Sequence, residues 1–221
     1  MAGLPGRKQT WQLSDNNNFL NIPPPVSKKR RLHRNMCCRF AINETVITWL
    51  SQFQPNEQLC IPGDIRPTNK TPVLVAGRDG PHVTYMTWGF TRQGKQLVIN
   101  ARSETVWEKP LFREDMARHR CVLPGAWFYE WDRQKQRNTF TAADGSILFL
   151  AGLFNNAAQF VILTTAADDI MRPVHDRMPV CIHRDKIHDW LFDDKPGCEH
   201  VMKENVLLKR THPSQQCSLW G

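Results

Sequence analysis

The chain has 221 residues, of which 41% are hydrophobic, and it carries a formal net charge of +8. This length suits one domain with its own core, and no apolar run is long enough to span a bilayer. No apolar h-region follows the N-terminus, which predicts no secretory signal. Residues 1–35 carry +6 of the charge and the remainder only +2, so the basic balance says little about what the folded part binds.

Seven cysteines are scattered through the chain, and none forms a C-x-x-C pair. This odd number argues against a disulfide scaffold or a zinc ribbon and is typical of a reducing, cytosolic compartment. The sequence contains no metal-ligand or nucleotide-binding motif. We therefore expect no metal, no cofactor and no membrane association, and take a monomer as the default.

Residues 1–35 are polar, basic and interrupted by proline, without hydrophobic periodicity. We expect a disordered leader there. The run from Lys28 to Arg31 has the charge to hold nucleic acid. The plainer interpretation is a solvated leader, or upstream sequence translated from a misassigned start.

An ordered hydrophobic pattern begins at Met36. A short strand is expected at 40–42, and Asn43 is a suitable N-cap for the helix that follows. Apolar residues recur at i, i+3, i+4 and i+7 from Val46, which predicts an amphipathic helix that ends at Pro55.

Short strands and turns dominate the rest of the chain. The first expected elements are a loop at 67–69, a hairpin of strands 71–76 and 83–88, a strand at 98–102, a helical turn capped by Ser103 and a helix that includes Met116 and ends near Arg120. An antiparallel meander is then expected, with strands at 121–122, 127–131, 139–142, 147–154 and 160–164. The last expected elements are a strand at 179–182, a helix at 187–191 and a strand at 206–208. We predict one α+β domain over residues 36–221, β-dominated, with mostly antiparallel strands and a few short helices.

Glu130 is the most informative polar residue of the expected strands. It lies between Tyr129 and Trp131 in an aromatic run, where burial would raise its pKa and suit it to acid–base chemistry. The competing interpretation is that Glu130 faces solvent while Phe128 is buried.

Other polar residues are informative only as a set. Asn100 in a buried strand needs hydrogen-bond partners, which a structural role or a substrate carbonyl can supply. Arg102 shares its strand face, and Arg39 is a second candidate phosphate ligand, although each suits an ordinary salt bridge. A lone histidine in a loop, as His175 is by itself, is more often structural or exposed than catalytic.

Cys37 follows a methionine, as a small residue does at a translation start. Removal of Met36 would give Cys37 a free α-amine and a free thiol on one carbon. These two nucleophiles together can perform chemistry that neither performs alone.

Nine motifs follow one another in a distinctive order. They are Met36-Cys37-x-Arg39-Phe40, Pro67-Thr68-Asn69 with Pro72-Val73, Trp88-Gly89, Asn100-Ala101-Arg102-x-Glu104-Thr105, Arg120-Cys121-x-x-Pro124, Trp127-Phe128-Tyr129-Glu130-Trp131, Ala151-Gly152-Leu153, Thr164-Thr165-Ala166 and His175-x-Arg177-Met178-Pro179-Val180. Their order and spacing over about residues 36–182 resemble the SRAP family, the SOS-response-associated peptidase-like proteins that sense abasic sites in DNA.

The resemblance implies a function in DNA damage repair. An N-terminal Cys37 would form a thiazolidine crosslink with an abasic site in single-stranded DNA, after self-processing ahead of that cysteine. The implied catalytic residues are Cys37, Asn100, Glu130 and His175: Glu130 handles protons, His175 protonates the sugar oxygen and Asn100 orients the amine. The implied DNA-binding residues are Arg39, Asn69, Trp88, Arg102, Thr164 and Arg177, with Trp88 stacking or wedging beside the lesion. The expected location is cytoplasmic, on the nucleoid in a bacterium or nuclear in a eukaryote.

Two features depart from the family pattern. Cys38 stands where the family has glycine, which adds a second thiol beside the reactive one. Cys37 is internal as written, so its amine is in a peptide bond. Translation from Met36 or self-cleavage would free the amine, whereas a retained leader would leave only DNA binding.

Three functions therefore stay open from the sequence. The first is the abasic-site crosslinker, an enzyme with lyase-like chemistry. The second is a thiol autopeptidase or hydrolase that acts on peptides, because Cys, His, Glu and Asn also suit thiol acyl transfer. The third is a noncatalytic module for single-stranded DNA, whose binding would depend strongly on salt.

Overall fold

The computed structural model describes residues 39–54, 62–92, 97–204 and 206–212. Contacts divide the chain into two units, Met1–Arg34 and Asn35–Gly221, and every described residue belongs to the second. The predicted disordered leader, Cys37 and the predicted end of the first helix at Pro55 lie outside the described residues.

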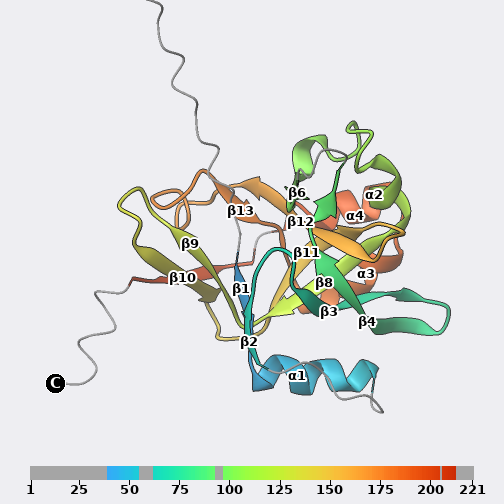
Figure 1. The fold of residues 1–221 in the computed structure, drawn as a ribbon, viewed down its shortest axis with the longest axis horizontal. Helices are drawn as coiled ribbons and strands as arrows, with labels where there is room; N and C mark the ends of the chain where they lie inside the picture. Colours follow the sequence, from blue (N-terminus) through green and yellow to red (C-terminus); the bar gives the residue numbers. More distant parts are fainter. Residues whose placement is uncertain (1–38, 55–61, 93–96, 205, 213–221) are drawn as a thin grey trace, which may run out of the picture. The chain divides into compact units, whose positions relative to one another are not determined.

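The first of two large sheets is antiparallel throughout (Figure 1). Its strand order is β15 (Leu208–Thr211), β10 (Arg137–Ala142), β9 (Trp127–Trp131), β1 (Phe40–Ile42) and β2 (Gly63–Ile65). The register aligns Phe40, Phe128 and Phe140 across three strands. All three are at most 1% exposed, and the rings of Phe128 and Phe140 stack with centroids 5.0 Å apart. This phenylalanine row forms the buried face of the first sheet.

The second sheet closes on itself. Its order is β13 (Arg177–Pro179), β12 (Gln159–Ala166), β4 (Gly80–Trp88), β3 (Lys70–Gly77), β8 (Arg120–Gly125), β11 (Leu148–Phe154) and β14 (Cys181–Ile182), with β7 (Asn100–Arg102) also paired to β12. Because β12 pairs with β11 as well as β4, five of these strands form a ring. The pairings of β12 with β4 and β7 are parallel, and the others are antiparallel. A two-stranded ribbon of β5 (Phe90–Thr91) and β6 (Leu97–Val98) completes the strands.

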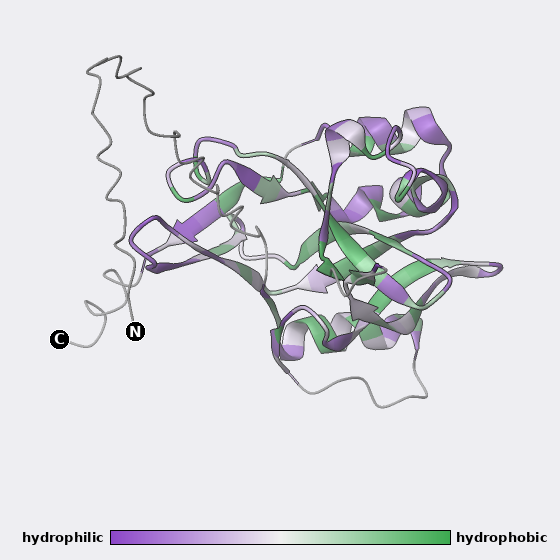
Figure 2. Cartoon of the chain, turned by 45° about the horizontal axis from the view of Figure 1, so that its top comes forward, coloured by the Kyte–Doolittle hydropathy of each residue, from purple (hydrophilic) through white to green (hydrophobic). Residues whose placement is uncertain are grey.

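Short helices lie around the sheets. They are α1 (Glu44–Leu50) with the 3-10 turn η1 (Ser51–Phe53), η2 (Ser103–Thr105), α2 (Arg113–Arg118), η3 (Arg184–Lys186), α3 (Ile187–Phe192) and α4 (Lys195–Val201). Asn43 caps α1 as predicted, since its side chain accepts from the Val46 N–H at 3.0 Å. In Figure 2 the helices alternate between hydrophilic and hydrophobic colours, whereas the central strands are mostly hydrophobic. No helix within the described ranges is long and apolar enough to cross a membrane.

The predicted fold class is confirmed: the domain is α+β, strand-dominated, mostly antiparallel and has few, short helices. The predicted hairpin of β3 and β4 is confirmed as well, with register Val73↔Thr84. The first helix, the helix that includes Met116 and the helix at 187–191 also lie where they were predicted.

Several predicted elements were wrong in detail. The strand at 98–102 is two strands in different sheets, β6 and β7, and the strand at 179–182 is likewise split into β13 and β14. The predicted meander is wrong, because the chain changes sheet between β8 and β9 and again between β10 and β11. Ser103 is the first residue of η2 and not its cap. The last strand was predicted at 206–208, whereas β15 begins at Leu208. Strand β2 and helix α4 were not predicted.

Candidate functional site

Four predicted site residues meet at the C-terminal end of β12. The parallel register places Asn100 beside Ile162 and Arg102 beside Thr164, and the antiparallel register on the other edge places Arg177 beside Ala166. Thr164 is 3% exposed and its hydroxyl donates to the Ala101 carbonyl at 3.3 Å. Strands β7, β12 and β13 therefore bring together residues that lie up to 77 positions apart in the sequence.

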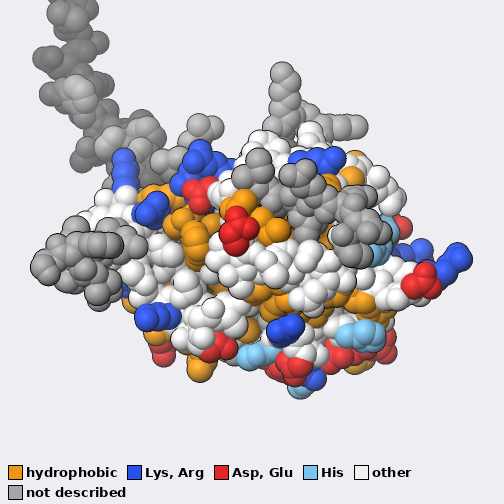
Figure 3. All heavy atoms as spheres, turned by 90° about the horizontal axis from the view of Figure 1, so that it is seen from below, with side chains coloured by type: hydrophobic (Ala, Val, Ile, Leu, Met, Phe, Trp, Pro, Cys, Tyr) orange, Lys and Arg blue, Asp and Glu red, His pale blue; other side chains and the backbone are white. Residues whose placement is uncertain are grey.

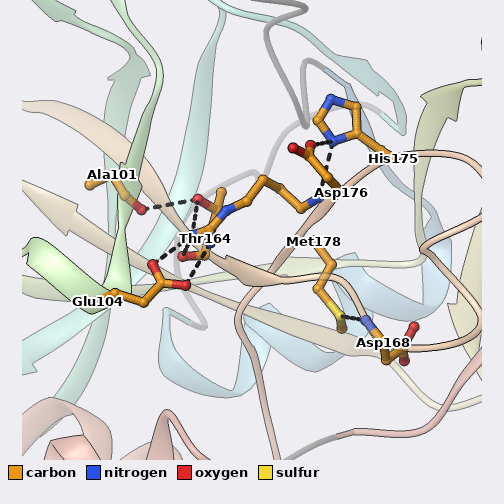
Figure 4. Close-up of polar contacts among 8 residues, drawn as sticks. Ala101, Glu104, Thr164, Asp168, His175, Asp176 and Met178 are labelled. Carbon is orange, nitrogen blue, oxygen red and sulfur yellow. Dashed lines mark hydrogen bonds and ion pairs between the residues drawn. The ribbon is translucent and has the colours of Figure 1, made fainter.

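Arg177 is already engaged by protein groups (Figure 4). Its Nη1 and Nη2 donate to the two carboxylate oxygens of Glu104 at 2.5 and 2.7 Å, and Nη2 also donates to the Thr164 carbonyl at 2.6 Å. The Arg177 guanidinium holds the pKa of Glu104 below its usual 4.5. A phosphate would therefore have to share or displace this carboxylate to bind Arg177. Glu104 carried no predicted role, although it lies two residues beyond Arg102 in the same motif.

His175 lies at the entrance to β13. Its Nδ1 accepts from the Arg177 backbone N–H at 3.1 Å and is 2.9 Å from Oδ1 of Asp176. The His175 side chain is 12% exposed, whereas that of Asp176 is 89% exposed. Asp176 carried no predicted role, because it is the unspecified residue of its motif.

Glu130 is buried on β9 and only 3% exposed. Its register partner on β10 is Asn138, which is fully buried. The competing interpretation was wrong: Phe128 and Glu130 are two residues apart, share one face of the strand, and are both buried. A carboxylate in such surroundings needs polar partners and is suited to proton exchange.

Arg39 lies across from Tyr129, whose N–H donates to the Arg39 carbonyl at 3.0 Å. Its guanidinium is 5.9 Å from the Tyr129 ring centroid and 5.6 Å from that of Trp131, and it forms an ion pair of 3.4 Å with Asp64. Arg137, which was not predicted, lies on the other side of this aromatic row. Its guanidinium is 4.9 Å from the Tyr129 ring centroid. Arginine and aromatic side chains thus alternate on one face of the first sheet.

Trp88 joins the two sheets. Its ring lies 5.5 Å from that of Phe40 on β1, and its indole N–H donates to the Ile99 carbonyl at 2.9 Å. The Trp88 side chain therefore contacts both Phe40 of β1 and the backbone of Ile99, the residue before Asn100. Trp88 is 0% exposed, so its predicted role in stacking on a base is wrong for this structure, because no surface of the ring is available.

Asn69 lies in the turn next to Trp88. Its carbonyl accepts from the Trp88 N–H at 3.0 Å, and its side chain accepts from the Arg66 N–H at 2.9 Å. Asn69 is exposed, and this side-chain bond fixes the turn that presents it.

None of the cysteines that the structure describes is a suitable nucleophile. Burial raises the pKa of Cys181 to about 12, raises that of Cys121 further, and also raises that of Cys198. A thiol that stays protonated near neutral pH is a poor nucleophile. The candidate nucleophile Cys37 lies outside the described residues. Within the described part of the chain, no group of three or more His, Cys, Asp and Glu side chains could hold a metal ion.

A well-formed cavity lies elsewhere. It has a volume of about 960 Å³ and lies beside α1, where Trp49, Phe149 and Ile182 line it together with Glu44 and Asp185. None of the described candidate site residues borders it. On the face shown in Figure 3, basic side chains are scattered among acidic and hydrophobic ones.

Comparison with known proteins identifies similar chains. The chain is 30% identical over 180 residues to the Abasic site processing protein YoaM of Bacillus subtilis, covering 71% of this chain and 79% of that protein. It is 27% identical over 184 residues to the Abasic site processing protein YedK of Escherichia coli, covering 74% and 83%.

A crystal structure of a protein from Bordetella bronchiseptica has the same fold, with a TM-score of 0.66 at 23% identity over 80% of this chain and 99% of that one. The model of the SOS response associated peptidase (SRAP) family matches residues 36–219. The chain therefore belongs to the SRAP family.

Proposed function

We propose that this protein processes abasic sites in single-stranded DNA by forming a covalent crosslink through Cys37 as its N-terminal residue. Relatives at 30% and 27% identity are named abasic site processing proteins, and they align with more than two thirds of this chain. An abasic deoxyribose opens to an aldehyde at C1′, which is an electrophile matched to an amine with an adjacent thiol.

The reaction needs no oxidant, reductant or metal. The α-amine nitrogen of Cys37 attacks C1′, and the aldehyde oxygen leaves as water to give a Schiff base. The thiol sulfur then adds to the same carbon, and the hydrogen of the thiol is transferred to the nitrogen. The product is a thiazolidine, and one water molecule is released for each crosslink.

The observation that carries the proposal is the burial of Glu130 beside the point where the chain enters β1. The Tyr129–Arg39 backbone bond aligns β9 with Arg39, and Glu130 is the next residue of β9. Consecutive Cα atoms are 3.8 Å apart, so the Cα of Cys37 is within about 7.6 Å of that of Arg39. A 3% exposed carboxylate at this place supports a role in moving protons to and from the amine and the departing oxygen.

We assign the remaining roles around this nucleophile. His175 donates the proton to the sugar oxygen as the ring opens, and Asn100 orients the amine. Arg39 and Arg102 contact phosphates, since Arg102 is exposed and Arg39 lies on the arginine–aromatic face. Asn69, whose side chain is exposed, is assigned a further contact with the DNA backbone.

Thr164 and Arg177 take a modified role. The Thr164 side chain is buried, and Arg177 is bonded to both Thr164 and Glu104. We therefore assign to Thr164 the task of holding Arg177, and to Arg177 a phosphate contact that it shares with Glu104.

The proposed chemistry requires a free α-amine on Cys37. The form that crosslinks must therefore lack residues 1–36, through translation from Met36 or through cleavage of the leader by the domain itself. Self-cleavage would account for the word peptidase in the family description.

The test uses a single-stranded oligonucleotide that carries one abasic site. We expect a band stable to denaturing electrophoresis, and a mass equal to protein plus oligonucleotide minus one water. Cys37→Ala should abolish it, whereas Cys38→Ser, which removes the neighbouring thiol, should not. Cys37→Ser should leave only a Schiff base that needs a borohydride reductant for capture.

Intact mass of the same samples identifies the N-terminus. If the full-length chain that retains residues 1–36 crosslinks, or if Cys37→Ala crosslinks as well as the unmodified protein, the proposal is refuted. Binding of intact and abasic strands with equal affinity and no covalent product would identify a noncatalytic DNA-binding module.

A further inference from the structure

The backbone around His175 is fixed on both sides. The His175 N–H donates to the Met171 carbonyl at 3.0 Å, and the Asp176 carbonyl accepts from the Ala167 N–H at 3.1 Å. Arg177 then opens β13, paired with Ala166 of β12. The imidazole therefore stands on a segment with little freedom to shift.

The side chain of Arg177 adds a second anchor to this segment. Glu104 and Thr164 together accept three bonds of 2.5 to 2.7 Å from its guanidinium. The backbone N–H of Arg177, which donates to Nδ1 of His175, is consequently held in a constant position.

Two groups with opposite requirements meet at Nδ1. The Arg177 N–H is a donor and needs Nδ1 without hydrogen, which in a neutral imidazole places the hydrogen on Nε2. The Asp176 carboxylate, 2.9 Å away, is an acceptor and needs hydrogen on Nδ1. The two contacts cannot both be favourable in one protonation state.

The partners also differ in mobility. The Arg177 amide belongs to a paired strand, whereas the Asp176 side chain is 89% exposed and can turn into water when Nδ1 has no hydrogen. Other charged groups nearby are already engaged: Arg172 pairs with Asp169 at 2.7 Å, and Asp168 accepts from the Met171 N–H at 2.8 Å.

We propose that Asp176 is a positioning residue that stabilises the form of His175 with hydrogen on Nδ1, while the Arg177 amide stabilises the neutral resting form. This inference rests on the proposed role of His175 as proton donor. An imidazolium that gives its Nε2 hydrogen to the sugar oxygen is left with hydrogen on Nδ1. Asp176 accepts from that hydrogen both before and after the transfer, so the carboxylate supports the acid throughout the step.

The test replaces Asp176 with Asn and follows the His175 ring by ¹⁵N-resolved NMR across pH, without DNA. Asp169→Asn is the matched control, because Asp169 has the same charge, is 90% exposed and does not contact His175. We expect Asp176→Asn to lower the midpoint of the His175 titration by about 0.5 pH unit, as befits an exposed pair. The control should leave the His175 midpoint unchanged. Asp176→Glu keeps a carboxylate and should therefore keep most of the wild-type midpoint.

A second measurement is the pH profile of the crosslinking rate. Its alkaline limb should move to lower pH in Asp176→Asn by the same amount as the NMR midpoint. An unchanged midpoint in Asp176→Asn, or an equal shift in the Asp169→Asn control, overturns the inference. The NMR result decides the role of Asp176 even if the wild-type protein forms no crosslink, so the two proposals fail separately.

Discussion

Arg120 is a buried cation whose removal should destabilise the domain strongly. It is 6% exposed, and its guanidinium donates to four backbone carbonyls: those of Trp190 at 2.6 Å, Met116 at 2.9 Å, Ala117 at 3.3 Å and also Asp193. These carbonyls lie at the C-terminal ends of α2 and α3, where a positive charge is favourable. One side chain thus ties two helices to β8.

The magnitude for Arg120→Met follows from the bonds that are lost. Methionine keeps an unbranched apolar stem but has no donor. The bonds to Trp190 and Met116 are buried, and an unsatisfied buried acceptor costs about 1–3 kcal/mol, so these two carbonyls alone cost about 2–6 kcal/mol. Removal of the cation relieves its own desolvation, which offsets part of this loss. We expect about 3 kcal/mol of lost stability, or a Tm lower by about 6–12 °C for a domain of this size.

Urea unfolding of both proteins, followed by tryptophan fluorescence, measures this difference. Arg118→Met is the control, because Arg118 is exposed on α2 and should change the stability by less than about 0.5 kcal/mol. Arg120→Lys keeps the charge but cannot reach all four carbonyls, so it should fall between the two. Stability of Arg120→Met within about 1 kcal/mol of wild type would refute the reasoning that these carbonyls depend on Arg120.

Three further predictions concern other parts of the domain. The pKa of Glu104 is lowered in the folded state, so this residue contributes stability above pH 4.5 that is lost as the pH falls through the folded pKa. The stability of Glu104→Gln should therefore decrease less than that of the wild type below pH 4.5, as urea unfolding at several pH values can measure. Asn43→Ala removes the bond to the Val46 N–H and should cost about 0.5–2 kcal/mol in thermal unfolding, whereas a change below about 0.2 kcal/mol would contradict the cap. Cys121 and Cys181 should resist iodoacetamide at pH 8 in the folded protein and react once it is unfolded, as peptide mass spectrometry can show; rapid labelling in the folded state would contradict their burial.

Local features of the fold were predictable from the sequence. The α1 cap depends on Asn43 and a residue three positions on, and the β3–β4 hairpin depends on a turn between adjacent strands. The burial of Glu130 was one of the two interpretations that its aromatic neighbours suggested. In each case the deciding interaction lies within a few residues, where periodicity and turn chemistry carry information.

Long-range pairings were not predictable in the same way. The Arg177–Glu104 pair joins residues 73 positions apart, so nothing in either motif indicated that the arginine was already engaged. The burial of Trp88 depends on contacts of its ring with Phe40 and Phe160, which are distant in the sequence and could not be predicted from its own motif. The division of 98–102 at Ile99 arises because β6 and β7 pair with different strands, which an uninterrupted apolar run does not reveal.

The closed ring of the second sheet has a consequence for how this chain is made. Strand β12 closes the ring by joining β4 and β11, and its pairing with β4 spans more than 70 residues. During synthesis, β3, β4 and β8 emerge long before β12 and leave one edge of β4 open, with its N–H and C=O groups free to pair with another chain. Contacts of such long sequence separation also form slowly. The most aggregation-prone interval in the life of this protein should therefore be the time between translation of Trp88 and translation of Ala166.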